Sequence, residues 1–105
     1  VTPQKGDLTV VYNNAYQGRI IKRIIGGAGD QITSEHGSVW INGVEIGRIY
    51  QQKNKLPPLT PIKSQIIQKG WVFLHSAHPR SFDSRYEEVG LVKVSDLEGK
   101  IIGVA

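Results

Sequence analysis

The sequence predicts an all-β protein whose short, twisted strands form a distorted barrel or stacked sheets. Three observations lead to this prediction. No long stretch of the chain has a hydrophobic period typical of a helix. The chain contains 12 glycines and 5 prolines, which interrupt it along its whole length. The pair Asn42-Gly43 separates two short apolar runs, and both residues tolerate the positive φ angles of a tight hairpin turn.

Runs of β-branched and aromatic residues mark the expected strands, and glycine, proline or polar clusters separate them. Residues 26–30 are predicted to form a turn. Segment 47–69, which contains three prolines, and the polar segment 75–88 are predicted to be mostly irregular. The predicted strands are 7–12, 18–25, 31–34, the two arms of the hairpin within 38–46, 64–67, 71–75, 89–94 and 100–104.

The composition fits one globular domain spanning residues 1–105. Hydrophobic residues make up 39% and charged residues 21% of the chain, which argues against disorder. The apolar runs are too short to span a bilayer, and no leader of the charged-then-apolar kind opens the sequence. The chain has no cysteine, which excludes a disulfide scaffold, a zinc-thiolate site and a cysteine nucleophile.

The formal net charge of +4 permits a nucleic acid, an anionic membrane surface or an acidic partner. The basic residues are scattered, however, and no aromatic residues are interleaved with them in the manner of an RNA-binding motif. We therefore expect no nucleic-acid partner. A small basic barrel that binds nucleic acid is kept as the least favoured alternative.

Lys22 lies in the predicted strand 18–25, where side chains alternate between two faces. Ile20 and Ile24 share the face of Lys22, whereas Ile21 and Ile25 share the face of Arg23. One of the two cations is therefore set against an apolar wall. A lysine in such a place loses hydration, its pKa falls, and its neutral amine can act as a general base. Alternation does not decide which face is inward, and a lysine that reaches into solvent is the alternative.

A second cluster lies at Ser81, Asp83 and Arg85, which share one face of an extended chain. The carboxylate and the guanidinium can form a charge-assisted pair next to the hydroxyl. The alternative is an exposed ion pair on a surface loop, which contributes about 0–1 kcal/mol.

No metal site and no cofactor are expected. His75 and His78 lack the carboxylates that would complete a metal site, and a Ser-His-Asp triad can be written only because serines are plentiful. The glycine-rich turn at 26–30 has neither the spacing nor the following helix of a phosphate-binding loop.

Taken together, these segments resemble the type I signal peptidases, the S26 family of serine–lysine peptidases. The resemblance covers nearly the whole chain, and the pairing of the second and last segments is its most specific part. The matching segments are Gly6-Asp7-Leu8 through Tyr12, Ile21-Lys22-Arg23-Ile24-Ile25-Gly26 with Gly29-Asp30, Trp40-Ile41-Asn42-Gly43, and Ser81-Phe82-Asp83-Ser84-Arg85-Tyr86 with Val89-Gly90 and Gly99-Lys100.

The resemblance implies a signal-peptidase-like (LexA-like) fold and an extracytoplasmic endopeptidase at the cell membrane. Lys22 would be the general base, Ser81 would orient its amine, and Asp83 and Arg85 would brace the site. The partners would be signal peptides of exported preproteins and the membrane surface. Substrate would lie extended along the strand edges at 7–11 and 19–22, in contact with Asp7, Leu8, Val10, Ile20 and Ile21.

Two departures from the family pattern affect activity. The family places its nucleophilic serine in a Ser-x-x-Pro segment shortly before Gly-Asp. Alignment on Pro3 puts this serine immediately before Val1, and alignment on Gly6-Asp7 puts it about three residues before Val1. We therefore expect a catalytic domain truncated before Val1, without nucleophile or membrane anchor and inactive in this form. His75-Ser76-Ala77-His78 stands where the family has Gly-Asp-Asn-Arg, which brings the chain closer to peptidases that process conjugative pilins. A non-catalytic β-domain that binds peptide is the remaining alternative.

Overall fold

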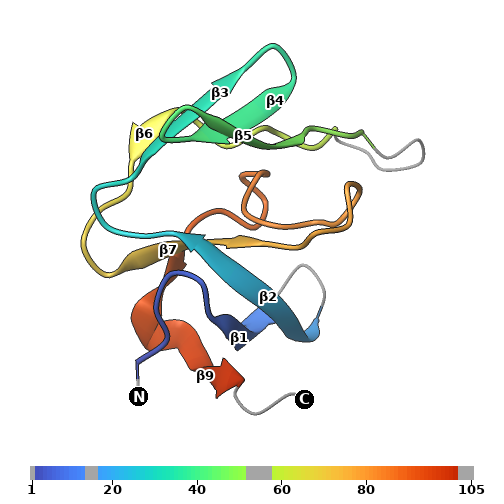
Figure 1. Ribbon diagram of the computed structural model, residues 1–105. Coiled ribbons are helices and arrows are strands. Elements are labelled where there is room, and N and C mark those ends of the chain that lie inside the picture. Colours follow the sequence, from blue (N-terminus) through green and yellow to red (C-terminus); the bar gives the residue numbers. More distant parts are fainter. Residues whose placement is uncertain (1, 14–16, 52–57, 102–105) are drawn as a thin grey trace.

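The computed structural model describes residues 2–13, 17–51 and 58–101 and contains two antiparallel β-sheets (Figure 1). The all-β prediction is confirmed; of the two expected arrangements, the sheets are stacked and do not close into a barrel. No helix among the described residues is long and apolar enough to cross a bilayer. The elements are β1 (Leu8–Asn13), β2 (Gly18–Gly26), β3 (Gln31–Glu35), β4 (Ser38–Ile41), β5 (Val44–Arg48), β6 (Gln65–Ile66), β7 (Trp71–His75), β8 (Val92–Lys93), the short 3₁₀ helix η1 (Val94–Asp96) and β9 (Leu97–Ile101).

The first sheet has the strand order β8-β7-β2-β1-β9. Strands β1 and β2 form a continuous antiparallel pair in which Thr9 stands opposite Lys22. On its other side β2 pairs with β7 only over Arg23, Ile24 and Gly26, since the chain leaves β7 after His75. The described strands thus leave one edge of β2 open over residues 18–22.

The second sheet has the order β5-β4-β3-β6. The predicted hairpin is confirmed: β4 and β5 are joined at Asn42 and Gly43, with φ angles of 51° and 81°. A second two-residue turn joins β3 and β4 at His36 and Gly37, with φ angles of 51° and 75°. Local sequence patterns do not predict this turn, because histidine is a less common residue at positive φ than asparagine.

Buried apolar side chains form one core between the sheets, another on the far face of the first sheet, and a third, smaller cluster of Leu59, Phe82 and Tyr86. Strand β7 is buried on both of its faces and contributes to each core, because Phe73 points one way while Val72 and Leu74 point the other. The core between the sheets contains Ile32, Val39, Ile41, Ile62, Ile67 and Phe73, and the second core contains Val11, Ile24, Val72 and Leu74.

The turn at residues 26–30 is organised by the Asp30 carboxylate. Its Oδ2 accepts hydrogen bonds from the Gly27 N–H at 2.9 Å and from the Lys5 Nζ at 3.1 Å, and its Oδ1 accepts one from the Asn42 Nδ2 at 2.9 Å. The Gly27 N–H is the main reason that the pKa of Asp30 is lowered. Asp30 thus connects Gly27, at the end of β2, to Asn42 in the turn of the β4–β5 hairpin.

The strand assignments differ from the prediction mainly near the C-terminal end. The predicted strand 89–94 is reduced to β8 at Val92–Lys93. Residues 97–99, taken for a loop because of Gly99, belong to β9. Gly99 has a φ of 138°, and the register between β1 and β9 shifts beside it, so the glycine marks an irregularity within a strand. Residues 102–104 of the last predicted strand lie outside the described residues.

Candidate active site

Lys22 is on the inward face of β2. Its side chain is 8% exposed and Ile24 is fully buried, whereas Arg23 points outward and donates from Nη1 to the Gly6 carbonyl oxygen at 2.7 Å. Burial lowers the pKa of the Lys22 amine below its usual value; the Asp83 carboxylate acts against this shift, and the Arg85 guanidinium adds to it. The strand therefore holds a desolvated lysine next to a pair of opposite charges.

The charge pair is itself buried. Asp83 is 0% and Arg85 is 1% exposed, and Arg85 Nε lies 2.8 Å from Asp83 Oδ1. The Arg85 N–H also donates to Asp83 Oδ1 at 3.0 Å, and the Ser76 N–H donates to Oδ2 at 3.2 Å. The alternative of an exposed surface pair is thus excluded for these two residues.

The remaining donors of Arg85 bind three main-chain carbonyl oxygens in two segments. Nη1 donates to the carbonyl oxygens of Arg48 at 2.8 Å and Pro79 at 2.9 Å, and Nη2 donates to that of Ser81 at 2.7 Å. Arg48 ends β5, so a single guanidinium connects the second sheet with the segment that follows β7. A planar guanidinium suits this role because it carries five donors in a fixed geometry.

Ser81 is half-buried, and its main chain is held at both ends. Its N–H donates to the His78 carbonyl oxygen at 3.0 Å, and its own carbonyl oxygen accepts from Arg85. The guanidinium that fixes the Ser81 backbone is the same one that acts on the pKa of Lys22. Lys22, Ser81, Asp83 and Arg85 are therefore linked through one buried cation.

The predicted substrate-contacting residues divide between two faces of the first sheet. Ile20 is on the face of Lys22, whereas Val10 and Ile21 stand opposite each other on the other face, where Ile21 is 58% exposed. The Asp7 carboxylate bonds locally, since its Oδ2 accepts from the Gln4 N–H at 2.8 Å. Leu8 is half-buried at the start of β1.

The expectation of an open strand edge along residues 7–11 is wrong. Strand β1 lies inside the sheet, with β2 bonded on one side and β9 on the other. Strand β9 covers this edge. The last strand was predicted at residues 100–104, whereas β9 begins at Leu97. Of the two predicted edges, only the edge of β2 is left open by the described strands, over residues 18–22, for pairing with a substrate strand.

Local sequence patterns give His75 no role, although the structure places it with Arg85 on the wall of one cavity. The half-buried imidazole donates to the Ile46 carbonyl oxygen of β5, and burial lowers its pKa. A single histidine at the end of a strand carries no local pattern that predicts such a place. Within the described ranges, no group of three or more metal-ligating His, Cys, Asp or Glu side chains occurs.

Gly47 is a second residue near the site that local sequence patterns do not indicate, because only its distance from Arg85 makes it important. A Cβ added at Gly47 would lie 2.7 Å from Arg85 Nη1 and 3.2 Å from Cδ. We expect Gly47→Ala to lower the free energy of unfolding by about 1–3 kcal/mol through overpacking. Thermal unfolding should show a Tm lowered by about 4–8 °C per kcal/mol.

The matched control for this variant is Gly27→Ala, since a Cβ added at Gly27 meets no atom within 4 Å. Its Tm should stay close to that of the wild type. A Gly47→Ala protein as stable as the Gly27→Ala protein would show that the Arg85 guanidinium can move aside.

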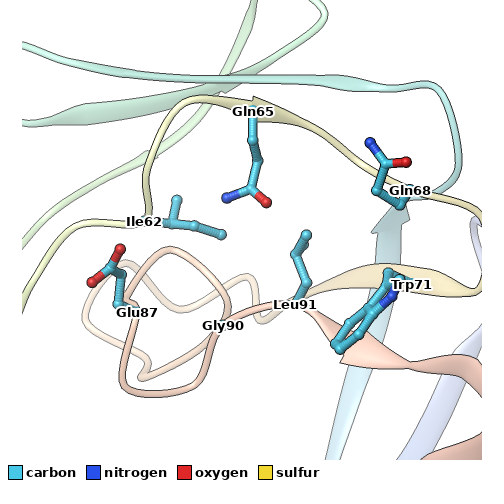
Figure 2. A pocket seen from close by; sticks show the side chains of 7 residues that line it. All are labelled: Ile62, Gln65, Gln68, Trp71, Glu87, Gly90 and Leu91. Carbon is cyan, nitrogen blue, oxygen red and sulfur yellow. The ribbon is translucent and has the colours of Figure 1, made fainter.

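Two cavities lie near the junction of the sheets. One, of about 290 Å³, is lined by His75, Arg85 and residues of β5, including Ile46 and Gly47. The other, of about 390 Å³, contains none of the predicted site residues (Figure 2). Figure 2 shows Gln65 and Gln68 on one side of it and Leu91 and Trp71 on the other, with Glu87 near Ile62 and Gly90.

Comparison with known proteins places the chain in a family. The model of the family described as "Signal peptidase, peptidase S26" matches residues 1–104. The crystal structure of a signal peptidase I from Enterococcus faecalis V583 is similar, with a TM-score of 0.65, 28% sequence identity, and coverage of 97% of this chain and 98% of that chain. A comparison with curated protein sequences finds no significant match. With its lysine-bearing strand and this family match along almost its whole length, the chain belongs to the signal peptidase family, peptidase S26.

Proposed function

We propose that this peptidase is a serine endopeptidase domain that removes signal peptides from exported preproteins by means of a serine–lysine dyad. The observation that carries the proposal is the buried Lys22, whose pKa is lowered next to the buried pair of Asp83 and Arg85. A neutral amine in an apolar setting is a competent general base, whereas an ordinary exposed lysine is protonated at neutral pH.

In the proposed mechanism, the neutral Lys22 amine takes the proton of a serine hydroxyl as that oxygen attacks the scissile carbonyl carbon. The resulting ammonium then gives the proton to the leaving amine, and an ester intermediate remains. Water hydrolyses the ester with Lys22 again accepting a proton. Main-chain N–H groups near the serine would stabilise the oxyanion.

We propose that the nucleophilic serine is contributed by residues preceding Val1 in the full-length protein. The Asp7 N–H donates to the Gln4 carbonyl oxygen at 2.9 Å, which closes a turn just before β1. The turn is joined to β2, since the Gly6 N–H donates to the Ile24 carbonyl oxygen at 2.7 Å. The segment entering β1 is therefore anchored to the strand that carries Lys22.

The proposed role of Ser81 is to orient the Lys22 amine, and that of Asp83 and Arg85 is to hold Ser81 in place. The hydrogen bond from Arg85 Nη2 to the Ser81 carbonyl oxygen supports this division of roles. The buried pair also balances its own charge, so neither member alone forces Lys22 to be charged or neutral.

The proposed substrate is an extended signal peptide that adds to the open edge of β2 over residues 18–22 by main-chain hydrogen bonds. The half-buried Ile20 provides an apolar wall on the Lys22 face, which favours small residues at the first and third positions before the cut. On the opposite face, Ile21 is exposed between Arg19 and Arg23, and the exposed Tyr12 stands opposite Arg19, which suits an anionic membrane surface on the extracytoplasmic side.

The proposal is tested by incubating the full-length protein with a leader peptide that has alanine at the first and third positions before the expected cut. Mass spectrometry should find one cut, directly after the first of these positions. The matched peptide with tryptophan at that position should stay intact. A pilin precursor is tested in parallel, because its cleavage would indicate the specificity of a conjugative pilin-processing peptidase.

Two results would count against the proposal. Binding of the peptide without any cleavage would favour a non-catalytic peptide-binding domain. Equal cleavage of the alanine and tryptophan peptides would show that the apolar wall does not select small residues.

A further inference from the structure

Thr9 is a buried polar residue on the face of the first sheet that carries Lys22. Strand β1 lies between β2 and β9 (Figure 1), and Thr9 is the residue of β1 that stands directly opposite Lys22. Side chains opposite each other in an antiparallel pair project from the same face, with their Cβ atoms about 4.5–5.5 Å apart. Thr9 is 0% exposed and Lys22 is 8% exposed. The threonine therefore borders the lysine side chain where it leaves the strand.

The hydroxyl of Thr9 is turned away from β2, towards β9. Its Oγ1 donates to the Gly99 carbonyl oxygen at 2.6 Å. Gly99 lies where the register between β1 and β9 shifts, so the bond provides a donor for a carbonyl oxygen at this irregularity. Because a β-branched side chain has few χ1 rotamers, the same bond fixes the whole side chain. The carbon atoms of Thr9 are then what it presents to Lys22.

We propose that Thr9 is a positioning residue for the lysine base: its carbon atoms pack against the aliphatic chain of Lys22, fix the direction of that chain and exclude water from its β1 side. This inference rests on the proposed function of Lys22 and adds a residue to it. Thr9 acts through Lys22 and need not touch the substrate.

The physical basis is the hydration of the Lys22 amine. An aliphatic chain that is packed on its β1 side keeps one direction, whereas free space beside it lets the chain turn and lets water enter. Burial is the main reason that the pKa of Lys22 is lowered, so a gain in hydration should raise this pKa.

The charges near Lys22 stay the same when Thr9 is replaced by another uncharged residue. Of these charges, the Asp83 carboxylate raises the pKa of Lys22 and the Arg85 guanidinium lowers it. A changed titration of Lys22 would therefore report a change in packing and hydration. The charged and titratable groups on the elements packed against Lys22 are Arg19 and Arg23 on β2, Asp7 just before β1, Glu98 and Lys100 on β9, His75 at the end of β7, and Asp83 and Arg85 in the segment after β7.

The first experiment is an NMR titration of the Lys22 Cε signal in the full-length protein, assigned by its loss in Lys22→Met. The pKa of Lys22 should be higher in Thr9→Ala than in the wild type. It should also be higher in Thr9→Ser, which keeps the bond to Gly99 but loses the methyl group. In Thr9→Val, which keeps the shape, it should stay close to the wild-type value, while the Tm falls because the Gly99 carbonyl oxygen loses its donor.

The second experiment is the pH dependence of kcat/KM for peptide cleavage. In Thr9→Ala the acidic limb should move to higher pH, with a tenfold loss of kcat/KM at a fixed acidic pH for each unit of that shift. The matched control is Val11→Ala. Val11 is 3% exposed on the same face of β1, but it stands opposite Ile20. Its truncation should lower the Tm and leave the acidic limb in place.

The outcomes separate the two proposals. Continued cleavage by Lys22→Met would overturn the proposed function itself. Loss of cleavage in Lys22→Met, together with a wild-type pKa of Lys22 in Thr9→Ala and Thr9→Ser, would overturn only the role of Thr9.

Two further results would also overturn the role of Thr9. One is an equal shift of the acidic limb in Thr9→Ala and Val11→Ala, since any loss of packing would then have the same effect. The other is a pKa of Lys22 that rises as much in Thr9→Val as in Thr9→Ser, since the shape of the side chain would then not matter. The comparison of Thr9→Val with Thr9→Ser decides the question even where Thr9→Ala fails to fold.

Discussion

Replacing Lys22 by methionine in the full-length protein is expected to lower kcat/KM for signal-peptide cleavage by at least about 10²–10⁴-fold, the usual contribution of a general base. Methionine has a similar length and fills the same apolar surroundings, but it cannot accept a proton. The loss should appear in kcat, since the main-chain bonds that would hold the substrate along β2 are unchanged. Steady-state kinetics on a leader peptide measures both parameters.

The stability of Lys22→Met should stay the same or rise, although its activity falls. The pKa of Lys22 is lower in the folded protein than in the unfolded chain, so the unfolded state binds more protons between these two values. The free energy of unfolding therefore rises with pH in this window, and at neutral pH the buried amine is a cost to stability. Lys22→Met should accordingly have a Tm equal to or above that of the wild type.

Lys69→Met, a replacement of an exposed lysine just before β7, is the matched control and should retain activity. An inactive but stable Lys22→Met protein would locate the loss in the chemistry rather than in folding. Retention of activity would remove Lys22 from the mechanism.

The second large effect is expected for Arg85→Met. This change leaves Asp83 as a buried, unpaired carboxylate and removes the donor from the carbonyl oxygens of Arg48, Pro79 and Ser81. Loss of one member of a buried ion pair typically costs about 3–5 kcal/mol. Because small domains have about 5–15 kcal/mol in total, urea unfolding should show a much lower midpoint.

The matched control is Arg19→Met. Arg19 Nε lies 2.8 Å from Glu98 Oε1, the same distance as in the buried pair, but its side chain is 69% exposed. Its removal should leave the urea midpoint almost unchanged. The urea midpoint of Arg85→Lys should fall between those of Arg85→Met and Arg19→Met, since an ammonium keeps the charge but not the planar set of donors. Equal midpoints for Arg85→Met and Arg19→Met would contradict a bracing role for the buried pair.

Local patterns in the sequence account for most of the strands. The Asn42-Gly43 hairpin was predicted correctly because its turn depends on two adjacent residues that tolerate positive φ. The C-terminal strands were less well predicted. Glycine is typical of loops, and no local pattern shows that the segment containing Gly99 pairs with β1. The same pairing overturned the expected open edge along β1.

By itself, the sequence determined that Lys22 and Arg23 point to opposite faces of one strand, and that Asp83 and Arg85 can form a pair. Only the tertiary structure decided that the Lys22 face is inward, that the pair is buried, and that His75 and Gly47 lie beside it. The physical reason is that alternation along a strand is a local property. Burial and charge at Lys22 depend instead on segments far along the chain, which meet only when the two sheets pack together.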